Sequence, residues 1–208
     1  MTAGFSLDRS VLTREDADRA AGVATRAFFD DNYFRYLMAD DRERARVLPL
    51  LFSSQLRRSG AHAHTVVARD AGEEIVAVAL WIEPGHWPPP LGTQLAQMPS
   101  SLRALYRHPH TLRLASTYLR TILKVHPKEM HWYLPLLAVD PSAQGHGVGT
   151  MLMDERVARM DQEHVGGYLE TQKEENHAFY NRFGFELRDT LHPALDGSPY
   201  YTMWRPAR

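Results

Sequence analysis

The stretch HWYLPLLAVDPSAQGHGVGT, residues 131–150, carries the strongest structural signal in this chain. Its first half is apolar and predicts a buried strand over residues 132–139, which Asp140 and Pro141 end. Its second half places glycine at positions 145, 147 and 149, directly before an amphipathic segment. A glycine-rich loop leaves backbone N–H groups uncovered, and the start of a helix adds partial positive charge. The stretch therefore predicts a site for a phosphorylated ligand.

Two known phosphate loops fit this stretch poorly. A P-loop ends in Gly-Lys-Ser/Thr, whereas here Gly149 is followed by Thr150 and Met151. The dinucleotide-binding pattern G-x-G-x-x-G has a threonine in place of its third glycine, and the loop before its first glycine is too long for that turn. Glu170 does lie about 20 residues further on, where that pattern places an acidic residue. We therefore disfavour the dinucleotide-binding interpretation and keep it as an alternative.

The pattern that remains is Gln144-x-x-Gly147-x-Gly149. AVDPSAQGHGVGTMLM resembles the pyrophosphate loop of the GNAT N-acetyltransferases, whose pattern is Gln/Arg-x-x-Gly-x-Gly/Ala. Further on, LETQKEENHAFYNRFGFE is similar to the strand, the Asn-x-x-x-Tyr helix and the Gly-Phe ending of that family. The residue pattern of both segments is also similar to that of the puromycin N-acetyltransferase-like branch. The resemblance covers the C-terminal third of the chain.

This resemblance implies an α/β protein with the GNAT fold. That fold has a mixed, mostly antiparallel central sheet flanked by helices, two splayed cofactor strands and, here, a helical insertion before the cofactor strand. The resemblance also implies acetyl-coenzyme A as the acetyl-donor cosubstrate, with direct transfer to an amine. The residues expected to bind it are Leu137, Ala138, Val139, Gln144, Gly145, His146, Gly147, Val148, Gly149, Thr150, Asn176 and Tyr180.

Tyr180 matches the family tyrosine that protonates the sulfur of coenzyme A as general acid. Asn176 lies one turn earlier on the same helix face, and by resemblance it hydrogen-bonds the pantetheine arm. Taken alone, an aromatic residue on a helix indicates core packing. The spacing Asn176-x-x-x-Tyr180-x-x-x-Gly184-Phe185 favours the catalytic interpretation instead.

The general base is less clearly marked. Glu170 ends its strand near the point where the two splayed strands should part, and we prefer it as the catalytic base. Glu83 at the end of another strand and His131 at the start of the cofactor strand are alternatives. Some members of the resembled family use a chain of water molecules instead of a dedicated base.

Pro135 lies in the middle of the predicted cofactor strand. Because proline cannot donate a ladder hydrogen bond, it predicts a bulge or an edge strand. By resemblance, the strand separates from its neighbour here and its freed backbone pairs with the pantetheine arm. Backbone donors aimed at the thioester oxygen would then stabilise the negative charge that develops on it.

Composition limits the functional classes. The chain has 208 residues, 44% hydrophobic and 24% charged, with a net charge of −1 and no cysteine. This predicts one domain over 1–208 with an ordinary core and excludes disulfides and cysteine nucleophiles. We expect neither a nucleic-acid nor a membrane partner, and cytoplasmic location is the default. A homodimer is compatible with the sequence.

The remaining chain predicts flanking helices and strands. The expected order is a short strand from residue 9, a helix capped by Thr13, a polar-aromatic connection at 30–40, and a helix at 41–58 bent near Pro49. A hairpin at 66–82, a chain break at Gly166-Gly167, a helix closed by Gly184 and two closing strands complete the sheet. The insertion spans about 84–130, with helices around 92–98 and 100–124, and is expected to wall the acceptor site.

Other functions are weaker fits. His62 and His64, like His108 and His110, are spaced i, i+2, but no His-Glu-x-x-His motif exists, so we expect no metal. The prediction is an N-acetyltransferase that acts on a small-molecule amine. The alternative is a non-catalytic acyl-coenzyme A-binding or regulatory module with the same fold. The sequence does not identify the acceptor.

Overall fold

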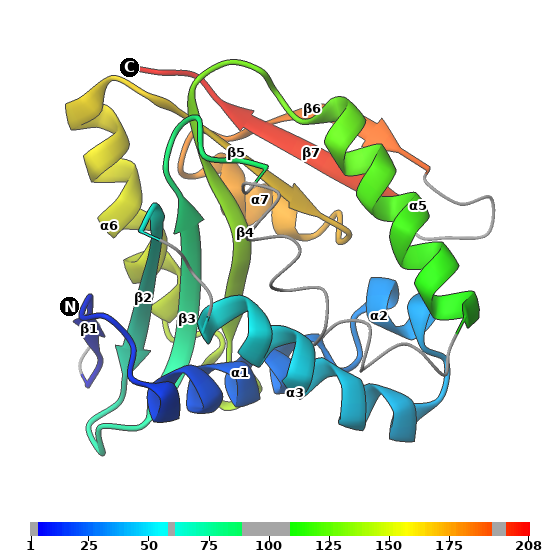
Figure 1. Ribbon diagram of the computed structural model, residues 1–208. Helices are drawn as coiled ribbons and strands as arrows, with labels where there is room; N and C mark the ends of the chain where they lie inside the picture. The colour runs from blue at the N-terminus through cyan, green and yellow to red at the C-terminus, as the bar shows by residue number, and fades with distance from the viewer. Residues whose placement is uncertain (1–3, 58–60, 89–108, 193–198) are drawn as a thin grey trace.

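A seven-stranded sheet in the order β1-β2-β3-β4-β5-β7-β6 forms the centre of the computed structural model (Figure 1). The structure describes residues 4–57, 61–88, 109–192 and 199–208. Only β4 and β5 pair in parallel, and the other neighbours are antiparallel. This confirms the predicted mixed sheet and excludes the doubly wound sheet of the dinucleotide-binding alternative. The strands are β1 (Ser6–Asp8), β2 (Ala63–Arg69), β3 (Ile75–Ile82), β4 (His131–Val139), β5 (Gly166–Thr171), β6 (Glu186–Leu191) and β7 (Tyr200–Arg205).

Helices cover both faces of this sheet. One buried cluster joins the sheet to α1, α2, α3 and α5, and a second joins it to α6 and α7. Figure 1 shows α6 and α5 on opposite sides of the molecule. Among the described residues, no helix is both long and apolar enough to cross a membrane. The helices are α1 (Arg14–Phe28), α2 (Asn32–Leu37), α3 (Asp41–Arg57), α5 (Pro109–Val125), α6 (Val148–Glu163) and α7 (Asn176–Asn181), with a 3₁₀ turn, η1, at Pro141–Ala143.

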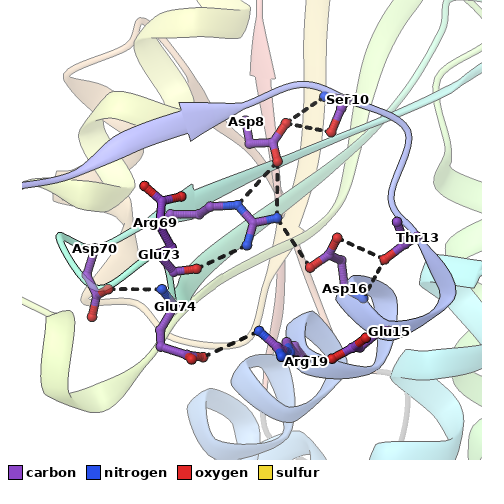
Figure 2. Close-up of polar contacts among 10 residues, drawn as sticks. All are labelled: Asp8, Ser10, Thr13, Glu15, Asp16, Arg19, Arg69, Asp70, Glu73 and Glu74. Carbon is purple, nitrogen blue, oxygen red and sulfur yellow. Dashed lines mark hydrogen bonds and ion pairs between the residues drawn. The ribbon is translucent and has the colours of Figure 1, made fainter.

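A polar network fixes the start of α1 against the edge of the sheet. Thr13 caps the helix as predicted, because its hydroxyl accepts a hydrogen bond from the backbone N–H of Asp16 at 3.1 Å. Figure 2 shows Arg69 of β2 reaching both Asp8 of β1, at 3.1 Å, and Asp16, at 3.2 Å. Arg69 also donates to the carbonyl of Glu73 in the β2–β3 turn. One guanidinium therefore joins β1, α1 and the hairpin.

Two N-terminal predictions were wrong in detail. The first strand is Ser6–Asp8, upstream of the expected position. The predicted connection at 30–40 contains α2, whose first turn is capped by the Asp31 carboxylate through the N–H of Tyr33 at 3.0 Å. An Asp before an aromatic run is a helix start. In contrast, the helix predicted at 41–58 is confirmed as α3, with Pro49 inside it, while the bend near Pro49 stays a prediction.

Gly166 and Gly167 do not break the chain as predicted, because both lie in β5. A Cβ atom on Gly166 would lie 2.6 Å from the carbonyl oxygen of Arg205, and one on Gly167 would lie 2.9 Å from the ring of Phe185. Glycine is therefore required here for close packing inside a strand rather than for a turn.

Pro135 produces a β-bulge in β4. The register with β3 shifts between Leu80 and Ile82, so that Leu134 and Pro135 together lie opposite Trp81. The predicted bulge is confirmed. The alternative of an edge strand is wrong, since β4 lies between β3 and β5.

The bulge reverses which side chains of β4 face which layer. Trp132 and Leu134 belong to the cluster with α6 and α7, whereas Leu136 and Ala138 belong to the cluster with α1 and α3. In a regular strand all four would point to one face. The extra residue therefore turns the second half of β4 over while both faces stay packed.

The described part of the insertion at 84–130 is helix α5 and its flanks. The helix expected at 92–98, and residues 100–108 of the next one, lie outside the described residues. α5 packs against α2, where the Thr111 hydroxyl donates to the carbonyl of Leu37 at 2.9 Å. The insertion is thereby joined to the helical layer of the N-terminal half.

Candidate active site

The parallel pair β4–β5 separates halfway along its length. Its register ends at Leu134 opposite Leu169. Beyond that point residues 136–139 still pair with β3, and Glu170 and Thr171 still pair with β7. The sheet is thus intact on both outer sides of a gap between the two strands. The predicted backbone groups of Leu137, Ala138 and Val139 border this gap.

The glycine-rich loop follows the separated end of β4. Gly145 has φ of 79° and Gly147 has φ of 81°, a left-handed conformation that glycine adopts without strain. Gly147 is the residue before α6, and no side chain caps this helix. The N–H groups of Val148, Gly149 and Thr150 therefore have no carbonyl partner inside the helix. Uncapped N–H groups at a helix start are suited to an anion, and the sequence predicts one here.

Local contacts hold the loop against β4. The carboxylate of Asp140 accepts hydrogen bonds from the backbone and the hydroxyl of Ser142, and it pairs with Arg26 of α1 at 2.6 Å. Gln144 donates its side-chain amide to the carbonyl of Val139 at 3.1 Å. The structure therefore directs Gln144 back to the strand end. His146 is exposed at the loop tip.

Gly149 lies at a close packing point between three elements. A Cβ atom there would lie 3.4 Å from the ring of Phe179 in α7 and 3.5 Å from a methyl group of Val139 in β4. The start of α6 thus rests directly on the strand and on the helix that carries Tyr180.

Tyr180 and Asn176 line the same cavity, on the side of β5. Asn176 donates its side-chain amide to the hydroxyl of Thr171, at 2.9 Å, which fixes its orientation beside the end of β5. Tyr180 is buried, and burial raises the pKa of its phenol. The phenol therefore stays protonated near neutral pH, as a proton donor must.

This cavity has a volume of about 710 Å³ and lies between the separated strands and the helices α1, α2, α3 and α5. Two carboxylates face it, from Asp31 and Glu170, while no lysine or arginine is among its described lining residues. Burial raises the pKa of Asp31, and Lys173 lies 3.6 Å from its carboxylate. The rest of the wall is largely apolar, and its aromatic residues are Phe28, Tyr33, Phe34, Phe52, Trp87, Tyr133, Tyr180 and Tyr200.

Of the three base candidates, only Glu170 lines the cavity. Glu83 instead binds two imidazoles, and hydrogen bonds from His64 and then His62 lower its pKa to about 2. His131 is buried beside His126, and burial lowers its pKa to about 4. The geometry therefore favours Glu170 among the predicted bases.

Near the rim of the cavity, His62, Glu83 and His86 bring ligand-type atoms within 4.8 Å of one another. The sequence pattern pairs His62 with His64 by spacing and gives no sign that His86 lies beside them. The rings of His62 and His86 are stacked, with centroids 3.5 Å apart and planes 16° apart. Nitrogen lone pairs lie in the ring planes, so in this arrangement the two imidazoles do not converge on one point.

The part of the cavity wall that α2 supplies was not predicted from the sequence. Tyr33 and Phe34 belong to α2, in the segment interpreted as a connection, and their aromatic character was the available signal. Trp87 and, from α5, Leu119 and Ile122 also line the cavity, and all three belong to the 84–130 insertion that was expected to wall the acceptor site. These walls come from segments that share no motif with the cofactor loop.

Comparison with known proteins agrees with this geometry. The model of the acetyltransferase (GNAT) family matches residues 18–185, which include both helical walls, the splayed strands and Tyr180. The chain belongs to the GNAT acetyltransferase family.

Solved GNAT structures cover nearly the whole chain. The histone acetyltransferase HPA2 and related acetyltransferase of Corynebacterium glutamicum is 27% identical, with a TM-score of 0.69 over 99% of this chain and 97% of that chain. A GNAT-family acetyltransferase of Desulfovibrio desulfuricans is 18% identical, with a TM-score of 0.57 over 97% and 98%. The ribosomal-protein-S18-alanine N-acetyltransferase of Escherichia coli is 15% identical, with a TM-score of 0.53 over 98% and 94%. The last two share the GNAT fold.

Proposed function

We propose that this GNAT protein is an acetyl-coenzyme A-dependent N-acetyltransferase whose acceptor is the primary amine of a small molecule with an apolar, ring-bearing body. The observation that carries the proposal is the cavity, which joins the separated strands and Tyr180 to an aromatic wall with two carboxylates. The similarity of the motifs to the puromycin N-acetyltransferase-like branch supports the same class of acceptor.

The residues present fit acetyl-coenzyme A. The uncapped start of α6, with left-handed Gly147 before it, offers backbone N–H groups to a pyrophosphate. The freed edge of β4 offers extended backbone to an amide-bearing arm, and Asn176 lies across the gap from it. When bound, the cosubstrate supplies the acetyl thioester.

Two side chains at the gap carry out the two proton transfers of the proposed reaction. Glu170 accepts a proton from the acceptor ammonium, which frees the nitrogen lone pair for attack. Backbone N–H groups of the separated β4 stabilise the negative charge that develops on the thioester oxygen. Tyr180, held protonated by burial, donates its proton to the departing sulfur.

The cavity wall supports a small-molecule acceptor. A cationic amine is compatible with Asp31 and Glu170, and an apolar body is compatible with the aromatic rings. An acidic or phosphorylated acceptor would find no lysine or arginine among the described lining residues. Histone and ribosomal-protein acetyltransferases occur among the similar structures, so a peptide acceptor is the alternative to test.

The test measures release of free thiol from acetyl-coenzyme A against a panel of amines. The panel contains arylalkyl amines, aliphatic polyamines and peptides with a free N-terminus. We expect turnover with the arylalkyl class and weaker turnover with the other two classes. Turnover confined to peptides would overturn the acceptor class. Calorimetric binding of acetyl-coenzyme A without thiol release from any amine would support the non-catalytic module instead.

A further inference from the structure

Glu170 has a neighbour that the proposed mechanism does not yet use. Its Oε1 lies 3.9 Å from Nδ1 of His126, just after α5, and the two side chains are 4% and 7% exposed. Nε2 of His126 lies 3.1 Å from Nε2 of His131, whose Nδ1 lies 2.6 Å from the carbonyl oxygen of Glu129. These contacts form a short chain that begins in the cavity and leads away from it.

The carbonyl at the far end fixes the proton positions along this chain. A carbonyl oxygen only accepts, so Nδ1 of His131 carries a hydrogen. Burial lowers the pKa of His131 to about 4, so near neutral pH its ring is uncharged and Nε2 bears a lone pair. Nε2 of His126 must then carry the hydrogen that the two rings share. In the neutral ring this leaves Nδ1 of His126 as an acceptor that points toward Glu170.

Two buried acceptors therefore face each other at the cavity wall. Neither Nδ1 of His126 nor Oε1 of Glu170 has a hydrogen-bond partner among the described residues. Buried polar atoms are usually partnered, so such a pair requires an explanation. A single added proton would satisfy both atoms, because a protonated imidazole or a protonated carboxyl group would donate a hydrogen bond to the other acceptor.

The other groups around the pair do not hold that proton near neutral pH. Tyr133, Tyr168 and Tyr200 lie beside Glu170, and burial followed by the charge of Glu170 raises the pKa of all three phenols. Hydrogen bonding to the Glu170 carboxylate adds to this for Tyr133 and Tyr168. Near neutral pH each phenol therefore keeps its own proton and cannot accept another. Arg188 carries a positive charge near the His131 end of the chain and pairs there with Glu129 at 3.8 Å. Trp87 packs against His126 without a titratable group.

We propose that His126 is the proton-sharing partner of Glu170, so that the pair rather than the carboxylate alone takes the proton from the acceptor ammonium. His131 is a positioning residue that fixes the tautomer of His126. This inference rests on the proposed acetyl transfer. The ammonium N–H bond breaks, its proton joins the Glu170–His126 contact, and the freed nitrogen forms the bond to the acetyl carbon while the carbon–sulfur bond breaks.

The protons balance across this step. An ammonium loses two protons when it becomes an amide. One is held by the Glu170–His126 pair and passes to solvent after turnover. The second restores Tyr180, which has given its own proton to the departing sulfur.

The first test uses no acceptor. Protein labelled with ¹⁵N in its histidine rings is examined by NMR across the pH range, using ring nitrogen shifts to identify protonation and tautomer. We expect His131 as the Nδ1–H form and uncharged His126 as the Nε2–H form. Glu170→Gln should change the ring nitrogen shifts of His126, because the group that faces its Nδ1 is then no longer a carboxylate. The opposite tautomers, or a His126 signal indifferent to Glu170→Gln, would overturn the proposal.

The second test uses thiol release with the best amine of the panel. His126→Gln should lower kcat about 10-fold or more and shift the acidic limb of the pH profile, with the KM for acetyl-coenzyme A unchanged. The control is His192→Gln, an exposed histidine outside the site. An unchanged kcat and pH profile in folded His126→Gln protein would overturn the proposal. If no amine is turned over, the proposed function fails, while the NMR test still decides the proton-sharing contact.

Discussion

Tyr180 combines two properties that a core tyrosine does not need together. It is buried against Phe179 and Phe185, and yet it lines the cavity between the separated strands. Tyr118 is its natural comparison, because it is also buried, is not among the residues that line the cavity, and has a hydroxyl without a hydrogen-bond partner among the described residues. Burial alone therefore does not distinguish the proposed proton donor from a core tyrosine, whereas a place in the cavity lining does.

Replacing Tyr180 by phenylalanine keeps the ring packing and removes the proton donor. Turnover should fall by roughly 10²–10⁴ while acetyl-coenzyme A affinity and melting temperature stay nearly constant. The measurement is kcat beside the melting temperature, with Tyr118→Phe as the matched variant that keeps full activity. Equal kcat values for the two folded variants would contradict a role of Tyr180 as proton donor.

Gly147 is predicted to contribute to acetyl-coenzyme A binding because it has no side chain to block the approach of the pyrophosphate to the backbone. A valine there should weaken acetyl-coenzyme A binding by ~2 kcal/mol or more, the scale of lost charge-assisted hydrogen bonds. It also strains the backbone, because φ is 81°. Gly4→Val is the control for that strain, since Gly4 has φ of 106° with no atom near its Cβ position. Calorimetry should show weaker binding in Gly147→Val only, and equal affinities would contradict a cofactor role of the loop.

At the scale of elements, β5 is held in place by contacts that leave no room for a side chain. It supports Glu170 and Thr171 at the edge of the gap, and its first two residues are glycines packed under β7 and Phe185. The position of Glu170, the proposed base, thus depends on packing at the opposite end of the same short strand.

Gly166→Ala and Gly167→Ala should destabilise the protein to different extents. The Cβ of Gly166→Ala meets a backbone carbonyl at 2.6 Å, which cannot move without disturbing β7, while that of Gly167→Ala meets the Phe185 ring and the flexible end of Met160. Overpacking costs about 1–3 kcal/mol, with Gly166→Ala expected at the upper end or beyond. Urea unfolding measures the loss of free energy of unfolding in each variant. A larger loss for Gly167→Ala than for Gly166→Ala would show that β7 shifts more easily than the core around Phe185.

The elements best predicted from the sequence are those whose signals are local. Thr13 before acidic residues gives the start of α1, and the β4–loop–α6 unit follows from its apolar run and its glycines. The strand glycines of β5 and the aromatic residues of α2 were misinterpreted, since a close approach of β7 or a cavity wall is set by residues far away in sequence. For the same reason the contact between His126 and Glu170 has no local pattern.

The whole molecule should lose stability in two stages on acidification. Burial lowers the folded pKa of His131 to about 4, below the usual 6.5, so the unfolded chain binds this proton first and stability falls as pH drops from 6.5 to 4. The loss is at most about 1.4 kcal/mol per pH unit. Melting temperatures between pH 4 and 7 measure it, and His131→Asn should flatten this stage. An unchanged slope in that variant would assign the stage to other groups.

Carboxylates at the β1–α1 edge contribute to the second stage. Hydrogen bonds from Ser10 and then Arg69 lower the pKa of Asp8, and those from Thr13 and then Arg69 lower that of Asp16. Their contribution is present above the usual pKa of 3.8 and is lost as pH falls through the lowered values. Arg69→Met should lower the melting temperature at pH 6 and make this acid stage shallower. A variant that keeps the full acid stage would show that Arg69 contributes little to it.

The bulge at Pro135 gives β4 two phases, one before it and one after it. Deleting Pro135 would join Leu134 directly to Leu136, so that Leu134 would lie opposite Trp81 and Leu136 opposite Leu80 in a regular ladder. Leu136 and Ala138 would still face α1 and α3, while Leu137 and Val139 would still face α6. In evolutionary terms the extra residue is a reversible step, because its loss would restore a regular strand while its neighbours keep their layers.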